Sequence, residues 1–208
     1  MTNSATTKSS SAANKSKPGR KPAEEKLVES ACELLTRQGP KTLSVRDIAK
    51  HAKVNHGLVH HYFGSKRDLL KDAIRKLASD HLENHKQAHL DKHMTPPPLT
   101  LSKDQDYVMA IIRCVLDGDM ELATLDIKEG ISVPRTILNA INSEAGNEKT
   151  PPELKAAMAV GMAVEWSWAA LGPYISDVLN VSAEQEPAIT QAISVASRYF
   201  MSNPELLE

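Results

Sequence analysis

The sequence has few aromatic residues and few cysteines. Aromatic residues make up 4% of the 208 residues, against 41% hydrophobic residues in all, a composition that favours helices over sheets. The two cysteines, Cys32 and Cys114, lie far apart and form no C-x-x-C motif, so neither a disulfide framework nor a zinc ribbon is indicated. We expect both to be buried free thiols.

Targeting, membrane and catalytic motifs are also missing. The first residues, "MTNSATTKSSSAANKSK", lack the apolar core of a signal peptide, and no apolar run reaches the roughly 18 residues of a membrane span. We therefore expect a cytoplasmic protein with no membrane partner. G-x-S-x-G, P-loop and H-E-x-x-H motifs do not occur, so we expect neither an enzyme nor a cofactor.

The net charge of -1 hides two halves of opposite sign. Residues 1–76 carry 16 Lys and Arg against 7 Asp and Glu, a net charge of +9, and the remainder carries 9 against 19, a net charge of -10. A basic N-terminal third attached to an acidic body is typical of a nucleic-acid-binding domain joined to a separate regulatory domain.

The N-terminal residues 1–19 are predicted to be a disordered basic arm. They consist largely of Ser, Thr, Ala, Asn and Lys, with almost nothing to bury, and run into the basic cluster "KSKPGRKP" at 15–22. Such an arm either contacts DNA phosphates or a minor groove, or is a solvated leader. The sequence leaves both readings open.

From Pro22 onward apolar residues recur at helical spacing. Ser44 is a good N-cap with Asp47 at the capping-box position, and Asn55 offers a second N-cap. The pattern predicts four helices in this part: one from Pro22 to Gly39-Pro40, then 45–51 and 56–62, and a longer one from Ser65 to about His93.

The prolines of "TPPPLT" end the long helix, and the rest of the chain is also helical in pattern. Further helices are predicted at about 103–117, 119–130, 134–144, 152–172 and 185–201. The fold class is therefore all-α. We predict a DNA-binding domain at 20–67, with three helices that include a helix-turn-helix, and a larger helical effector-binding and dimerisation domain at 68–208.

The segment "SVRDIAKHAKVNHGLVHHYF" has the spacing of a helix-turn-helix whose second helix enters a major groove. With "LTRQG" before it and "GSKRDLL" after it, the segment resembles the TetR family of transcriptional regulators over about residues 22–77. The resemblance implies DNA contacts at the start of the second helix and along the third: Ser44, Val45, Arg46, Asn55, His56, Gly57, His60, His61, Tyr62 and Lys66.

The chemistry of these residues agrees with that implication. Gly57 places no side chain between helix and groove, Lys66 lies at a helix N-terminus where its charge and the helix dipole attract phosphate, and Tyr62 has a hydroxyl to donate. Phe63 is expected to turn inward. Histidine at both positions 60 and 61 leaves the base readout open, because an imidazole donates to a phosphate or to a purine N7 and changes charge with pH.

The histidines also raise the question of a metal site. His56 and His60 are four residues apart, but no carboxylate or cysteine nearby completes a set of ligands, so we expect no metal. The series His81, His85, His89 and His93 winds round the predicted long helix and cannot converge on one ion. A solvated polar face is its simplest interpretation, and a metal or effector role stays open.

The C-terminal part contains the segment "PELKAAMAVGMAVEWSWAALGPYI", which is apolar on nearly all sides and must be covered. The resemblance implies that it forms a homodimer interface with "EPAITQAISVASRYF". The core of a monomeric bundle is the competing explanation, although a two-fold operator favours a dimer.

The resemblance also implies a pocket for an unidentified small-molecule effector among these helices. Ordinary core packing is the alternative, which the residues alone do not exclude. The candidate ligand-binding residues are Tyr107, Ile111, Ile112, Val115, Leu125, Ile137, Ile141, Glu165, Trp166 and Trp168.

The predicted function is that of a ligand-responsive transcriptional regulator, a repressor, that binds a palindromic double-stranded DNA operator as a homodimer. A small molecule bound to the C-terminal domain would release the operator, with the helix after the helix-turn-helix as the lever. The alternative is an architectural DNA-binding protein that is indifferent to sequence, which competitor DNA would distinguish.

Overall fold

The computed structural model describes residues 21–91, 101–146 and 148–203. These residues form α-helices and no strand, which confirms the all-α prediction for the described part of the chain. The helices are α1 (Lys21–Arg37), α2 (Val45–His51), α3 (Gly57–Phe63), α4 (Lys66–Asp91), α5 (Leu101–Leu116), α6 (Met120–Ala123), α7 (Leu125–Lys128), α8 (Val133–Glu144), α9 (Pro152–Val178) and α10 (Glu186–Ser202). The predicted basic arm at 1–19 lies outside the described residues.

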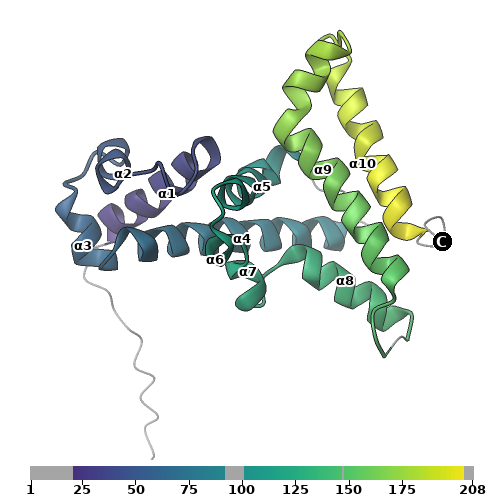
Figure 1. Cartoon of the computed structure of the whole chain (residues 1–208), viewed down its shortest axis with the longest axis horizontal. Coiled ribbons are helices and arrows are strands. Elements are labelled where there is room, and N and C mark those ends of the chain that lie inside the picture. The colour runs from purple at the N-terminus through teal and green to yellow at the C-terminus, as the bar shows by residue number, and fades with distance from the viewer. Residues whose placement is uncertain (1–20, 92–100, 147, 204–208) are drawn as a thin grey trace, which may run out of the picture.

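The long helix α4 connects the two ends of the molecule (Figure 1). Its N-terminal end lies next to α1 to α3, and it runs past α5 to α7 towards the pair formed by α9 and α10. Helix α4 packs against α1 and α3 as well as α5 and α7. A displacement of its axis therefore changes the packing both in the helix-turn-helix part and in the helices that follow it.

One hydrophobic core crosses the predicted domain boundary between residues 67 and 68, which falls inside α4. Leu27 and Leu35 of α1, Leu69 of α4 and Leu122 of α6 all belong to it and are at most 1% exposed. The helix-turn-helix therefore shares a packed interior with the helices that follow it.

The segment predicted as one helix at 119–130 is two short helices instead. Asp119 caps α6 by accepting a hydrogen bond from the Leu122 amide at 3.2 Å. Thr124 separates α6 from α7, and its hydroxyl donates to the Met120 carbonyl at 2.7 Å. A short polar side chain that bonds the backbone locally competes with a regular helix, and Gly130 with φ 73° then ends α7.

Helix α9 continues through Pro173 to Val178, beyond the end predicted at 172. It packs along α10, where Met201 occupies the space that a side chain at Gly161 would need, and the Ser197 hydroxyl donates to the Gly161 carbonyl at 3.2 Å. Trp168 Nε1 donates to Thr190 Oγ1 at 3.1 Å across the same contact. Tertiary packing thus holds the two helices together despite the internal proline.

Both cysteines are buried free thiols, as predicted. Burial raises the pKa of each thiol from 9.0 to about 12, so the reactive thiolate is scarce at neutral pH. We expect both cysteines to react far more slowly with a thiol reagent such as iodoacetamide in the folded protein than in denaturant. Mass spectrometry of the alkylated peptides checks this, and rapid labelling of either cysteine in the native protein would contradict its burial.

None of the helices within the described ranges is long and apolar enough to cross a membrane.

Candidate nucleic-acid interface

The helix-turn-helix is built by local capping. Ser44 Oγ accepts from the Asp47 amide at 3.1 Å, and the Asp47 carboxylate accepts from the Ser44 amide at 3.1 Å, the reciprocal capping box predicted from the sequence. Lys53 turns the chain between α2 and α3 with φ 55°. The predicted second helix therefore has the bounds 45–51.

Helix α3 begins one residue later than predicted. His56 occupies the cap position, while Asn55 Oδ1 accepts a hydrogen bond from the Gly57 amide at 2.8 Å. The Asn55 side chain thus satisfies one of the free amides at the start of α3. Gly64, with φ 77°, ends the helix after Phe63.

The predicted DNA-contacting residues lie in the two helices and at their ends, and most of them are solvent-exposed. The exposed members are Ser44, Arg46, Asn55, His56, Gly57, His60 and His61. Val45 and Tyr62 are half-buried against the core, and Phe63, which was expected to turn inward, is half-buried with them.

The exposed histidines of α3 are not equivalent. His60 Nδ1 lies 3.1 Å from the Gly64 carbonyl, which only accepts, so Nδ1 carries the hydrogen. The Nε2 of neutral His60 is then an acceptor, and it becomes a donor only when the ring is protonated. His61 packs edge-on against Tyr62, with ring centroids 5.0 Å apart.

No group of three or more potential metal ligands occurs among the residues that the structure describes. In the second histidine series His81 is only 3% exposed and stacks on Tyr107, with ring centroids 4.5 Å apart. It belongs to the interior, so the interpretation of the series as a solvated face is wrong at His81. His93 lies outside the described residues.

Lys66 is held differently from the sequence-based expectation. Its ammonium donates to the carbonyl oxygens of Pro40 at 2.9 Å and Leu43 at 2.8 Å and so fastens the loop between α1 and α2 to the start of α4. An ammonium has three N–H donors, so one is left for another acceptor. A phosphate contact would use that donor or displace a carbonyl.

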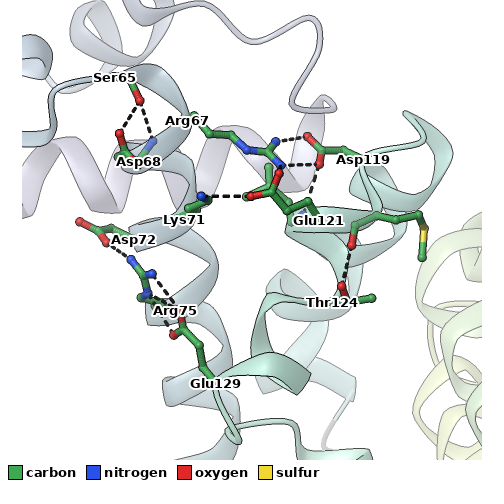
Figure 2. Close-up of polar contacts among 12 residues, drawn as sticks. Ser65, Arg67, Asp68, Lys71, Asp72, Arg75, Asp119, Glu121, Thr124 and Glu129 are labelled. Atoms are coloured by element: carbon green, nitrogen blue, oxygen red, sulfur yellow. Dashed lines mark hydrogen bonds and ion pairs between the residues drawn. The ribbon is translucent and has the colours of Figure 1, made fainter.

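Three cations of α4 point towards the segment that contains α6 and α7, as Figure 2 shows. Arg67 makes a two-pronged pair with Asp119 and also contacts Glu121 at 2.8 Å, and Lys71 Nζ lies 3.1 Å from Glu121. Further along α4, Arg75 forks onto the Glu129 carboxylate, with Nη2 2.8 Å from Oε1. We call these contacts the α4 ion-pair cluster.

The ion-pair cluster is intact at neutral pH. Hydrogen bonds from Arg67 hold the pKa of Asp119 below its ordinary 3.8, and bonds from Lys71 and Arg75 do the same for Glu121 and Glu129, below 4.5. A depressed pKa contributes stability above the unfolded-state pKa, which is lost as pH falls through the folded-state value. Acid therefore weakens the cluster only below these ordinary values.

Asp117, at the end of α5, makes a second link to the DNA-binding part. Its Oδ2 accepts from the Lys41 backbone amide at 2.8 Å, in the loop between α1 and α2. A side-chain carbon on Gly39 would come within 2.2 Å of this carboxylate, so the close approach depends on glycine. The turn between α5 and α6 thus contacts both the loop and α4.

A cavity of about 210 Å³ lies between α5, α7, α8 and α9. Of the candidate ligand-binding residues, Tyr107, Ile111 and Trp166 line it. The others lie outside its lining: Ile112, Val115, Leu125, Ile137, Ile141, Glu165 and Trp168.

Helical geometry explains the residues that miss the cavity. Val115 lies on the same side of α5 as Ile111 but one turn further along, where it is 45% exposed, and Ile141 lies about one turn beyond Leu138 on α8. Ile112 and Ile137 directly adjoin lining residues in the sequence and so point to another side of their helices. Trp168 is directed to α10 through Thr190. The ligand-binding role of all these residues remains a prediction.

Sequence reasoning missed Asp126, which lines the cavity although it is only 2% exposed. Its Oδ2 accepts from the Tyr107 hydroxyl at 2.8 Å. Burial, and then the nearby Asp126 charge, raises the pKa of Tyr107 well above its ordinary value, so this phenol stays protonated. An acidic residue between Leu125 and Ile127 was the available signal.

The capped α2, the tight turn and the exposed α3 define a helix-turn-helix DNA-binding protein. Residues 27–73 match the sequence model described as "Bacterial regulatory proteins, tetR family". Residues 27–73 thus resemble the DNA-binding region of the TetR family, and this similarity supports a DNA-binding transcriptional regulator.

Similar proteins match the chain either over most of its length at low identity or over a short segment at higher identity. The chain is 24% identical over 177 residues to the HTH-type transcriptional repressor Rv3405c of Mycobacterium tuberculosis, which covers 85% of this chain and 87% of that protein. It is 43% identical over 54 residues to the HTH-type transcriptional regulator BetI of Agrobacterium fabrum, which covers 26% of each chain. The BetI of Rhizobium meliloti is 42% identical over 62 residues.

Proposed function

We propose that the protein is a homodimeric repressor that binds a palindromic operator through α2 and α3 and releases it when a small molecule binds among α5 to α9. The main observation in support of a DNA-binding face on α3 concerns Gly57. Its φ is not positive, and the nearest atom to an added side-chain carbon is Asn55 Oδ1 at 3.3 Å, with nothing else within 4 Å. Apart from the Asn55 side chain, no neighbour and no positive φ calls for glycine there, which supports an approach of DNA from outside.

The DNA-contacting residues divide into two proposed groups. Arg46, exposed at the start of α2, and the half-buried Tyr62 and Lys66 flank the face and are proposed to hold phosphates. His56, Gly57, His60 and His61 belong to α3 or its cap and are proposed to face the major groove. Ser44, Val45 and Asn55 complete the set at the helix starts.

The hydrogen bond between His60 and Gly64 limits which DNA groups His60 is proposed to contact. With Nδ1 engaged by Gly64, neutral His60 offers an acceptor and suits a base amino group such as the N6 of adenine or the N4 of cytosine. Donation to a purine N7 or a phosphate requires the protonated ring. The proposed readout therefore differs between the two charge states.

Exposed apolar side chains on the last two helices support the proposed dimer. Leu171, Tyr174 and Val178 of α9, and Val195 and Tyr199 of α10, are each at least 50% exposed. Their spacing places each group on one side of its helix. Large apolar residues gathered on one element mark an interaction surface, and a two-fold operator requires a two-fold protein.

The α4 ion-pair cluster supports the proposed response to an effector. Asp119, Glu121 and Glu129 border the same short segment that presents Ala123, Asp126 and Ile127 to the cavity. A molecule that displaces this segment pulls on α4 and hence on the position of α3. The proposal that the protein represses rather than activates transcription rests on its similarity to the Mycobacterium tuberculosis repressor.

The experiment that tests this function is selection of DNA from a random pool, followed by titration of the selected palindrome in excess non-specific DNA. A specific regulator prefers the palindrome by about 10³-fold or more, and two protomers bind per site. An architectural protein would show little preference, and that result would favour the alternative function.

Gly57→Ala is expected to separate folding from DNA binding. The added methyl group meets only the Asn55 side-chain oxygen, at a tight 3.3 Å, and alanine is the better helix former, so the free energy of unfolding should change by no more than about 1 kcal/mol in either direction. Affinity for the selected palindrome should fall by about ten-fold or more, because a methyl group forced into a packed contact costs about 1–3 kcal/mol. Denaturant unfolding and fluorescence anisotropy measure the two effects.

Ser143→Ala is the control for that change. Ser143 is exposed on α8, away from α2 and α3, so the substitution also places alanine in a helix. We expect its DNA affinity to be unchanged. Equal affinity of Gly57→Ala and the unmodified protein would remove α3 from the proposed docking face.

A further inference from the structure

The cavity is small and mostly apolar. Ile111 of α5 and Met158, Met162 and Trp166 of α9 supply apolar walls around a volume of about 210 Å³. Ligand cavities usually measure about 300–1,000 Å³, so this one suits a molecule smaller than a typical drug. Thioethers are polarisable and adapt to an apolar body, and the face of an aromatic ring attracts a cation.

Asp126 lines this cavity, and one oxygen of its carboxylate accepts no hydrogen bond from the described residues. Oδ2 accepts from the Tyr107 hydroxyl, whereas Oδ1 is buried with no hydrogen-bond partner among the described residues. A buried polar atom without a partner costs about 1–3 kcal/mol, more if it is charged. The site therefore gains free energy from any molecule that brings a donor to Oδ1.

The charges around the cavity favour one kind of donor. No Lys, Arg or His of the described residues forms an ion pair with Asp126, and Tyr107, which donates to it, is a neutral phenol. Arg135 also lines the cavity but is exposed to solvent. A single positive charge at Asp126 is thus attracted, and a second one would be repelled by Arg135.

Asp126 also stands at a junction of the helices. Tyr107, which bonds it from α5, stacks on the buried His81 of α4, with ring planes 18° apart. A ligand that draws Asp126 away from Tyr107 therefore alters a packed contact with α4. The same short segment carries the acidic side of the α4 ion-pair cluster.

We propose that this cavity binds a small organic monocation, a protonated amine with an apolar body, whose charged group donates to Asp126 Oδ1. The inference rests on the proposed function for its regulatory meaning, because it names the chemical class of the effector. The existence of the binding site does not depend on repression and is measured without DNA.

The test uses Trp166 as a reporter. The chain has two tryptophans, and Trp168→Phe removes the one that faces α10, so the remaining fluorescence comes from the cavity wall. Benzylamine, benzyl alcohol and benzoate are the probes, since they share a ring and differ only in the head group. We expect benzylamine to bind at least about ten-fold more tightly than benzyl alcohol, and benzoate more weakly still.

Asp126→Asn is expected to abolish the preference for the amine over the alcohol, because asparagine keeps the shape of the side chain and removes its charge. Asp177→Asn, an exposed aspartate of α9 outside the cavity lining, is the control and should keep the preference. If Asp126→Asn does not fold, as judged by circular dichroism, the three probes on the reporter protein still decide the question.

Equal binding of the three probes, tighter binding of benzoate, or no fluorescence change with benzylamine up to millimolar concentration would overturn the proposal. So would an amine preference that survives in Asp126→Asn. A final titration adds benzylamine to the complex with the selected palindrome. Binding of the amine without release of DNA would leave the site standing and would count against the proposed effector response alone.

Discussion

Leu171→Glu combined with Val195→Glu is expected to convert the protein to a monomer and to lower its affinity for the selected palindrome by about 10²–10⁴-fold. Both side chains are about half exposed, at 52% and 50%, so the charges cost little in the isolated protomer. In a closed interface they would be desolvated without partners, which costs several kcal/mol. The loss of affinity follows because one protomer reaches only one half-site.

Leu116→Glu is the matched control for this double variant. Leu116 lies on α5 and is 73% exposed, so the substitution adds one glutamate, half the charge of the double variant, to an exposed leucine away from α9 and α10. We expect it to remain dimeric. Light scattering after size-exclusion chromatography gives the mass of each variant, and a dimeric, fully active double variant would place the interface elsewhere on the molecule.

Asp119→Asn is expected to weaken binding of the palindrome by about three- to ten-fold. The substitution breaks the charged pair with Arg67 that joins the α5–α6 turn to the start of α4, and it keeps a side chain able to cap α6. A simple charge argument predicts the opposite, since removing a negative charge from a DNA-binding protein strengthens its attraction to phosphate. The sign of the change therefore separates positioning of α4 from bulk electrostatics.

The same substitution should lower the free energy of unfolding by about 1–2 kcal/mol, between the values for exposed ion pairs and for buried charged hydrogen bonds. Asp80→Asn is the control, because the ion pair of Asp80 is with Lys76 of the same helix. We expect that control to bind DNA as tightly as the unmodified protein or slightly more tightly. Tighter binding by Asp119→Asn would mean that the ion-pair cluster does not position the recognition helix.

A double-mutant cycle isolates the pair itself. Arg67→Ala and Asp119→Ala should each destabilise the protein, and the double variant should lose less than the sum, by about 1 kcal/mol or more of coupling. Chemical unfolding of the four proteins measures this energy. Additive losses would mean that the two side chains act independently.

The helices α2 and α3 and their order followed from the sequence because the signals that form them are local. Ser44 and Asp47 cap α2 within one turn, Asn55 serves the start of α3, and Gly64 ends it. The apolar positions of α1 repeat at helical spacing, so its buried face was also readable. Such features need no knowledge of what packs against them.

The sequence was less informative wherever a helix depended on its neighbours. Thr124 breaks the predicted 119–130 helix, and α9 continues through Pro173 because packing outweighs propensity there. The sequence predicts a polar, solvated face that includes His81, yet Tyr107 of another helix covers it. Helix periodicity says which residues share a face but not which face is covered.

By itself, then, the sequence determined the all-helical fold, the helix-turn-helix and the split between a basic head and an acidic body. Tertiary structure alone decided that Lys66 holds the α1–α2 loop, that Arg67 meets Asp119, and that Asp126 faces a cavity beside Tyr107. Capping and amphipathicity act over a few residues, so they can be read along the chain. Ion pairs and cavities form between residues tens of positions apart, and only the packing of whole helices brings them together.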